Sequence, residues 1–142
     1  MINDFKSLFD LSSSVIKNNL VVGLSGGPDS VFLLYYIKYL KEHFGFLGTV
    51  NPIIVDHGLR IESNNEALKT KKIADMIGYD SKIIKIKDRY SSGNLQNWAR
   101  IRRRDILYQT AQKYSANIVL GHQYDDQIET IYMRLMRSSG FD

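Results

Sequence analysis

The chain of 142 residues contains no cysteine. This absence excludes disulfide bonds, zinc sites built from thiolates and a catalytic thiol. No apolar stretch approaches the roughly 18 residues that a membrane span requires, because runs such as residues 31–36 are soon interrupted by charge. The first residues do not show the basic-then-apolar pattern of a secretory leader. We therefore expect a cytoplasmic protein with no membrane segment.

Proline is also scarce, with two in the chain. Pro28 follows two glycines and fits the first turn of a helix, and Pro52 fits the first position of a strand. No repeat, low-complexity tract or linker divides the sequence. At 44% hydrophobic and 24% charged content, we predict one domain over residues 1–142 with a single core.

Short apolar segments alternate along the chain with longer segments of helical periodicity. Strands are expected at residues 20–24, 53–55, 81–86 and 118–120. Helices are expected at residues 5–16, 63–77, 95–114 and 125–137, and one more begins at Pro28, is apolar over residues 31–40 and stops at Gly45. A capping box of Ser63 and Glu66 is predicted to open the helix at residues 63–77. This alternation predicts an α/β fold, a Rossmann-like doubly wound parallel sheet with helices on both faces.

Ligands of such sheets bind beyond the carboxyl ends of the strands, at the point where the strand order reverses. We assume the order 3-2-1-4, which puts the reversal between the first and fourth strands. Residues 25–30 and 121–126 would then face each other across one cleft.

The first of these loops reads Ser25-Gly26-Gly27-Pro28-Asp29-Ser30. Its glycines let backbone amides approach an anion, and its hydroxyls and the following helix start add donors, so the loop indicates a phosphate site. It is not a Walker A loop, because the Gly-Lys-Ser/Thr of that motif is missing. The alternative is that turn geometry alone selects these residues.

The loop resembles the Ser-Gly-Gly-x-Asp-Ser signature of the PP-loop ATP pyrophosphatases, matched at Ser25, Gly26, Gly27, Asp29 and Ser30. The resemblance implies a PP-loop ATPase fold, like that of the adenine nucleotide alpha hydrolases, with ATP bound by residues 25–30. In that family the loop holds the leaving pyrophosphate while ATP is split to AMP.

Three further segments resemble the tRNA(Ile)-lysidine synthetases of that superfamily. They are residues 55–60 with Ser63, Glu66 and Ala67, residues 99–103, and residues 121–130 followed by 134–140. The sequence departs from the family pattern at Arg104, where tyrosine is usual, at Gln123 and Tyr124, where His and Ala are commoner, and at Ser138, where glycine is usual. The resemblance implies a ligase that adenylates the wobble cytidine of a tRNA(Ile) with a CAU anticodon. It then joins L-lysine to C2 of that base to form lysidine, releasing pyrophosphate and AMP.

Members of that family continue beyond the motif in which this chain ends. We therefore expect residues 1–142 to be the N-terminal, ATP-binding catalytic part of a longer protein. The oligomeric state stays open, with a homodimer as one option.

Adenylation requires neutralisation of developing negative charge, so Mg²⁺ is expected together with ATP. Asp29 is predicted to hold it, because magnesium prefers oxygen ligands. Asp29, Arg100 and His122 are the predicted catalytic residues, and the family resemblance puts His122 beside the ATP phosphates. Asp56 and His57 are predicted nucleotide contacts. Their alternatives are that Asp56 only stabilises its turn and that His57 is a capped loop residue.

Asp126 and Glu129 stand at positions i and i+3 of the last predicted helix. Their carboxylates can therefore reach one point and bind the ammonium group of lysine. The alternative is that acids at a helix start merely favour the helix dipole.

Four arginines fall within residues 100–104. Helical geometry puts Arg100, Arg103 and Arg104 on one face and Arg102 on another. We expect Arg100 nearest ATP and Arg103 or Arg104 nearer RNA. The alternative is a solvated helix face.

Three other functions are alternatives. A PP-loop tRNA thiolation enzyme shares the activation step, but such enzymes generally depend on cysteines. Ammonia-using synthetases of GMP or NAD share the loop but not residues 121–130. A nucleotide- or RNA-binding fragment without turnover is the alternative from a different class.

Overall fold

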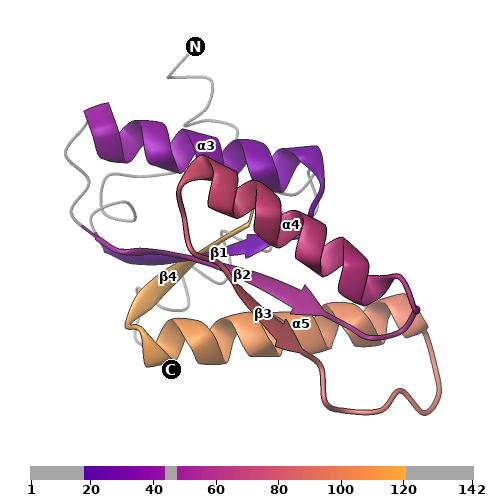
Figure 1. The fold of residues 1–142 in the computed structure, drawn as a ribbon. Helices are drawn as coiled ribbons and strands as arrows, with labels where there is room; N and C mark the ends of the chain where they lie inside the picture. Colours follow the sequence, from indigo (N-terminus) through magenta and orange to yellow (C-terminus); the bar gives the residue numbers. More distant parts are fainter. Residues whose placement is uncertain (1–17, 44–47, 121–142) are drawn as a thin grey trace.

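The computed structural model describes residues 18–43 and 48–120. Four parallel strands form one sheet in the order β3-β2-β1-β4. The elements, shown in Figure 1, are β1 (Asn19–Leu24), α3 (Pro28–His43), β2 (Val50–Asp56), α4 (Ser63–Ile77), β3 (Lys82–Lys85), α5 (Leu95–Lys113) and β4 (Ala116–Leu120). This arrangement confirms the predicted α/β fold and the assumed strand order.

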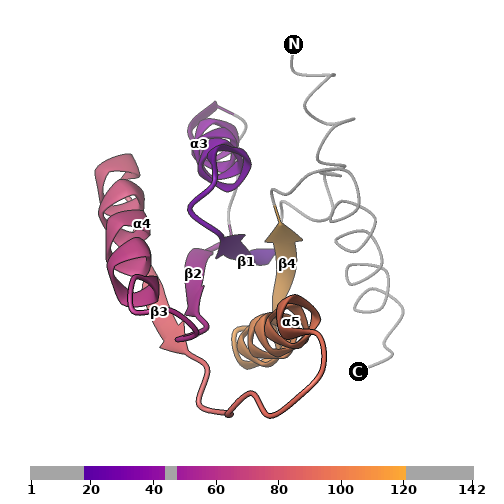
Figure 2. The same cartoon turned by 90° about the vertical axis from the view of Figure 1, so that its right-hand side faces the viewer.

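The helices cover both faces of the sheet. Figure 2, which looks nearly along the strands, shows α3 and α4 on one side of the sheet and α5 on the other. The connection from β3 to β4 through α5 therefore changes face, as in a doubly wound fold.

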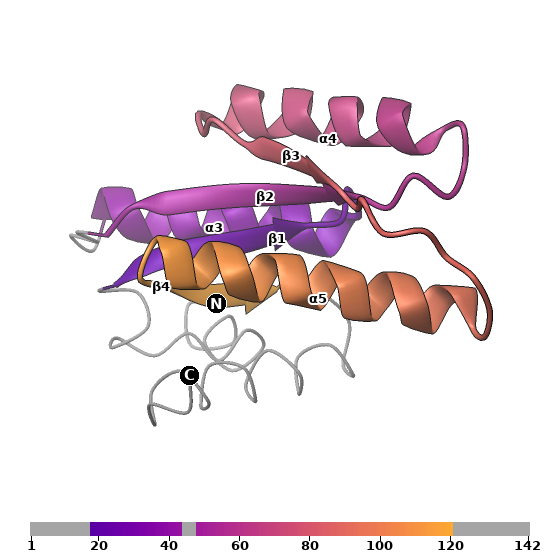
Figure 3. The same cartoon turned by 90° about the horizontal axis from the view of Figure 1, so that it is seen from below.

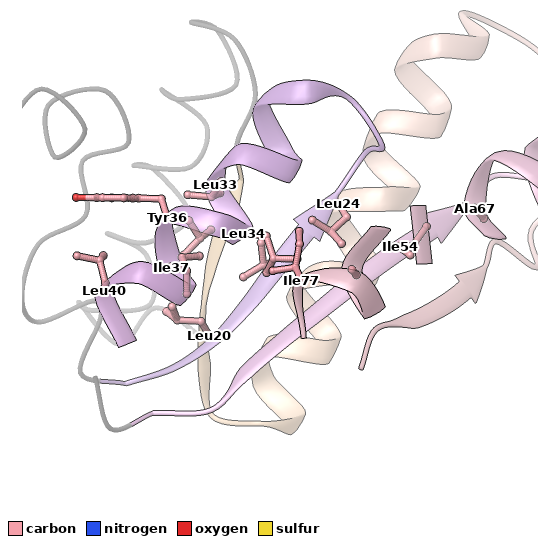
Figure 4. Packing of buried hydrophobic residues seen from close by; sticks show 13 residues of the cluster. Leu20, Leu24, Leu33, Leu34, Tyr36, Ile37, Leu40, Ile54, Ala67 and Ile77 are labelled. Atoms are coloured by element: carbon pink, nitrogen blue, oxygen red, sulfur yellow. The ribbon is translucent and has the colours of Figure 1, made fainter. Parts of the chain in front are cut away.

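A separate apolar cluster fills each interface between the sheet and its helices. Side chains of β1 alternate between the two clusters, since Leu20 and Val22 face α3 whereas Val21 faces α5. The larger cluster, seen in Figure 4, includes Leu20, Leu24, Leu33, Leu34, Tyr36, Ile37, Leu40, Ile54, Ala67 and Ile77.

The capping box predicted for α4 is wrong. The N-cap residue is Glu62, which makes no side-chain capping bond, and Ser63 is already the first helical residue. The turn begins earlier than expected, because the Ser63 amide donates to the Arg60 carbonyl at 3.1 Å. The Ser63 hydroxyl accepts from the Arg60 amide, and the Glu66 carboxylate binds the Arg60 guanidinium at 3.1 Å.

Pro52 is the third residue of β2 and not the first, as was predicted. The pairing of β2 with β3 begins only at Ile53 and Lys82. Pro52 therefore lies beyond the end of β3, where its missing N–H breaks no bond to that strand.

The strand register brings three carboxyl ends together. Leu24 of β1 pairs with Ile54 of β2, and Gly23 pairs with Leu120 of β4. The loop after β1 therefore starts between the ends of β2 and β4, which is where ligands of such sheets bind.

The helices predicted at residues 5–16 and 125–137 lie outside the described residues. In residues 18–43 and 48–120, none of the helices combines the length and the apolar character that crossing a bilayer requires.

Candidate functional site

The loop between β1 and α3 is closed by the hydroxyl of Ser30. This hydroxyl accepts a hydrogen bond from the Ser25 amide at 3.2 Å and donates one to the Gly27 carbonyl at 3.1 Å. The Ser25 hydroxyl in turn accepts from the Gly27 amide at 3.3 Å. Ser30 is fully buried, whereas Ser25 and Gly26 are exposed. Ser30 therefore shapes the loop from inside, and Ser25 and Gly26 form its outer surface.

Gly26 has a backbone and a packing reason to be glycine. Its φ of +84° lies in the left-handed region that side chains rarely adopt. A Cβ at this position would lie 2.7 Å from Oγ1 of Thr70 on α4. The loop thus passes close to α4 while its outer side stays open, and α3 begins at Pro28 with the positive end of its dipole at the loop. This is the arrangement that an anion site needs.

A pocket of about 240 Å³ opens next to this loop. It lies at the carboxyl ends of β1 and β2, under the first half of α4. Its lining residues are Leu24, Ser25, Ile54, Val55, Asp56, His57, Ser63, Glu66, Ala67, Thr70 and Arg103. This volume is below the roughly 300–1,000 Å³ of a complete ligand site, so the pocket suits one part of a ligand whose remainder lies over the loop.

Asp56 and His57 both line the pocket and both also hold their own turn. Oδ1 of Asp56 accepts from the Gly58 amide at 2.9 Å, and Nδ1 of His57 accepts from the Leu59 amide at 3.3 Å. Asp56 is almost fully buried, since only 4% of it is exposed. The two uses that the sequence left open for Asp56 are therefore compatible, because one carboxylate oxygen holds the turn while the residue faces the pocket.

The structure gives Arg102 and Arg103 of α5 different surroundings. Arg103 lines the pocket. That Arg100 is the arginine nearest ATP stays a prediction. Arg102 is on another side, as predicted, and pairs with Asp88 at 2.9 Å and Asp105 at 3.5 Å. Arg103 reaches the pocket because α5 crosses beneath the ends of β1 and β2, seen in Figure 3. Which of the arginines contacts RNA stays a prediction.

Asp29 lies exposed in the first turn of α3, directly after the loop. In residues 18–43 and 48–120, no group of three or more His, Cys, Asp or Glu side chains is placed to hold a metal ion. A single carboxylate at the loop nevertheless fits magnesium, which is commonly bound by one or two carboxylates together with substrate phosphates. Three further predicted site residues, His122, Asp126 and Glu129, lie outside the described residues.

Sequence reasoning missed Thr70 as a site residue. Ser63, Glu66, Ala67 and Thr70 recur at the spacing of one helix face, and this face of α4 lines the pocket. The spacing is visible in the sequence, and three of these residues had been noted for a family resemblance, but Thr70 had not been singled out.

A family model described as the PP-loop domain matches residues 2–142. The chain belongs to the PP-loop domain family. This membership confirms the family that the loop at residues 25–30 indicated, and it implies ATP binding.

Curated relatives in this family are tRNA(Ile)-lysidine synthases of bacteria. The protein of that name from Bradyrhizobium sp. (strain BTAi1) is 34% identical over 122 residues, which cover 85% of this chain and 34% of the relative. The one from Clostridioides difficile is 35% identical and covers 94% of this chain and 31% of the relative. The one from Bacillus cereus is 36% identical, and the match covers 97% of this chain and 29% of the relative. The chain therefore spans about a third of the length of these relatives.

A solved structure with a similar fold is the U34-tRNA thiolase NcsA from Methanococcus maripaludis with its [4Fe-4S] cluster. The TM-score is 0.68 at 23% identity, and the match covers 96% of this chain and 49% of that chain. At this identity the likeness concerns the fold alone.

Proposed function

We propose that this chain is the ATP-binding part of a tRNA(Ile)-lysidine synthetase. The observation that carries the proposal is the loop at residues 25–30, which begins at the carboxyl end of β1, ends at a helix N-terminus and borders a polar pocket. The similarity to bacterial tRNA(Ile)-lysidine synthases supports the choice of reaction within the family. The substrates are ATP, L-lysine and a tRNA(Ile) with a CAU anticodon.

In this proposal the nucleoside part of ATP occupies the pocket and the phosphates lie over the loop. The pocket is large enough for part of a nucleotide, and its wall combines apolar Ile54 and Ala67 with polar Asp56 and Thr70. The β- and γ-phosphates would meet the outer side of the loop at Ser25 and Gly26 and the N-terminus of α3.

The first chemical step is attack by the C2 oxygen of the wobble cytidine on the α-phosphate. The bond between the α-phosphate and the bridging oxygen breaks, and pyrophosphate leaves. The loop amides and the dipole of α3 stabilise the negative charge that moves onto the leaving group. Arg103, at the pocket wall, supplies a positive charge on the side facing α5.

In the second step, the amine of lysine attacks C2 of the activated base. The carbon–oxygen bond to the adenylate breaks, AMP leaves, and the amine loses a proton. Asp126 and Glu129 would bind the ammonium group of lysine for this step, and His122 would lie beside the phosphates.

Magnesium supplies positive charge to the phosphates when it is bound. Asp29 would hold it, since its exposed carboxylate follows the loop directly.

The test is release of AMP from α-labelled ATP by a protein that contains this chain together with the remaining length of its relatives. We expect AMP only when a tRNA(Ile) transcript with a CAU anticodon and lysine are both present. Without lysine, the label should remain on the tRNA as an adenylate. A transcript with U34 in place of C34 is the matched control. AMP released without tRNA, or equally with the U34 transcript, would overturn the proposal.

A further inference from the structure

The positive charge of the chain is concentrated in one stretch. Residues 85–104 hold seven of the 19 Lys and Arg and one of the 15 Asp and Glu, which gives this stretch a net charge of +6. The rest of the chain has 12 basic and 14 acidic residues and is therefore net −2. The stretch comprises the end of β3, the loop that follows and the first half of α5. The loop and the first turns of α5 extend past the carboxyl ends of β1 and β2 (Figure 3).

An aromatic pair lies within this basic stretch. The rings of Tyr90 and Trp98 meet edge to face, with centroids 5.8 Å apart and an interplanar angle of 68°. Both side chains are half-buried, so each keeps ring surface in contact with solvent. Trp98 precedes the pocket residue Arg103 by five positions, or about 7 to 8 Å along the helix axis. The pair is therefore close to the pocket along the helix, although neither of its residues lines the pocket.

The loop that carries Tyr90 is fixed to α5. Asp88 pairs with Arg102 of α5 at 2.9 Å, and the Tyr90 hydroxyl donates to the Gly93 carbonyl. Asn94 caps α5 by accepting from the Asn97 amide at 3.1 Å. These bonds hold the aromatic pair in place before a ligand arrives, which lowers the entropy cost of binding.

We propose that Tyr90 and Trp98 stack one unpaired base of an RNA strand whose phosphates lie along the surrounding basic stretch. The inference rests on the proposed function in one respect, since it takes an RNA loop as the substrate presented to the pocket. Proteins bind single strands by combining positive charge with aromatic rings on which bases stack. A duplex keeps its base faces covered, so it cannot use the rings. An acidic peptide could use the charge but gains nothing comparable from an indole face.

The tryptophan fluorescence of the chain comes from Trp98 alone, because it is the sole tryptophan of the 142 residues. A base that stacks on Trp98 can therefore be detected by a change in this fluorescence. An RNA hairpin with a seven-nucleotide loop should quench its fluorescence on titration. The same stem sequence as a blunt duplex should bind weakly at matched salt and leave the fluorescence unchanged. Equal quenching by the duplex, or by a polyglutamate peptide, would overturn the proposal, because charge alone would then explain the binding.

Variants distinguish a role of Trp98 in stacking RNA from a role in packing the fold. Trp98→Ala should weaken hairpin binding about 10-fold, in the range that loss of one stacked base produces, whereas Trp98→Phe should stay within about three-fold. The matched control is Tyr35→Ala, which removes an exposed aromatic ring, 53% accessible, from α3. Binding is measured by anisotropy of labelled RNA, and thermal unfolding verifies that each variant is folded. If Trp98→Ala binds the hairpin as tightly as the parent, the inference is wrong.

We distinguish this inference from the proposed function by measuring ATP binding on the same proteins without RNA. If the chain binds ATP normally but does not stack RNA, the inference is wrong and the proposed function is unaffected. If the chain stacks RNA but does not bind ATP, the proposed function is wrong and the stacking site stands.

Discussion

Gly26 meets two separate requirements of the loop between β1 and α3. Its backbone takes a left-handed conformation, and its missing side chain leaves room for Thr70 of α4. The first requirement concerns the fold of the loop, and the second concerns how close the loop comes to the pocket wall. Both are therefore expected to influence nucleotide binding.

Gly26→Ala should raise the Kd for ATP at least about 10-fold, because the new Cβ would displace the loop from its position against Thr70. Isothermal titration calorimetry measures this directly. Gly93→Ala is the matched control, since Gly93 also has a positive φ, +94°, but a Cβ there meets nothing within 4 Å. Equal losses of ATP affinity in the two variants would show that backbone strain, and not the approach to Thr70, is responsible.

Ser30→Ala should also weaken ATP binding, although the Ser30 side chain is buried. The substitution leaves the Ser25 amide without its acceptor and frees the Gly27 carbonyl, so the loop loses the shape that presents its amides. An unfolding free energy lower by about 1–3 kcal/mol is expected from the removal of these bonds. Denaturant titration and ATP calorimetry measure the two effects.

Ser81→Ala serves as the control for that experiment. Ser81 is 2% exposed, and its hydroxyl has no hydrogen-bond partner in the described part of the chain. This variant should therefore keep both stability and ATP affinity. An unchanged Kd in Ser30→Ala would count against any role of its hydroxyl in the phosphate site.

At the scale of elements, α5 connects the pocket beside the loop at residues 25–30 with the basic stretch. Its buried side packs Leu107 and Ala111 against the sheet, and Arg103 reaches the pocket from the same helix. Residues closer to its N-terminus extend past the sheet. One helix thus contributes to two surfaces, and substitutions along it should have different effects.

Charge reversal at Arg103 and Arg104 should lower RNA affinity and flatten its salt dependence, by about one unit of slope for each phosphate that the arginines neutralise. Arg103→Glu should weaken ATP binding as well, because Arg103 lines the pocket. Arg104→Glu should leave ATP binding intact. Anisotropy of labelled tRNA across a salt series, with ATP calorimetry on each variant, tests both statements. If affinity and slope stay unchanged in both variants, the arginines form a solvated helix face.

The elements themselves were predictable from the sequence because each has a strong periodic signal. The position of β1, the start of α3 at Pro28 and the range of α5 were all expected within a few residues. The loop at residues 25–30 was also located correctly, since its glycines and hydroxyls fall between a strand and a helix. Its role as a phosphate site stays a prediction.

Details that depend on neighbours in space were not predictable. The Ser63 and Glu66 pair has the spacing of a capping box, but both side chains bind Arg60 instead, in a turn that precedes the helix. The position of Pro52 depends on how far β3 extends, which the sequence of β2 does not encode. Arg103 as a pocket residue was not foreseen either, because helical periodicity gives the face of a residue but not what that face meets. Its predicted contact with RNA stays a prediction.

At the scale of the whole molecule, the chain is about a third as long as the curated relatives that it matches. The second substrate site predicted from the sequence, Asp126 with Glu129, follows β4 along the chain. Leu120, the last residue of β4, pairs with Gly23, two positions before Ser25. The chain therefore leaves β4 beside the start of the phosphate loop.

Asp126→Asn or Glu129→Gln in the full-length protein should raise the apparent KM for lysine about 10-fold or more. Each change removes a charge but keeps size, and a charge-assisted hydrogen bond contributes roughly 1.5–3 kcal/mol. ATP binding should barely change. Steady-state kinetics at varied lysine and ATP calorimetry measure the two outcomes. Normal lysine kinetics with failed ATP binding would instead assign these carboxylates to the magnesium site.

The short strand β3 has a consequence for the behaviour of the protein at high concentration. It is an edge of the described sheet, only four residues long, and both its terminal residues, Lys82 and Lys85, are exposed. A hydrogen bond to the Tyr114 hydroxyl raises the pKa of Lys82, so this lysine loses its charge only at a more alkaline pH than an ordinary lysine. A short edge that ends in lysines is a poor template for the strand of another molecule. Replacing both lysines by valine should therefore promote aggregation, visible as light scattering on gentle heating, while ATP affinity stays the same.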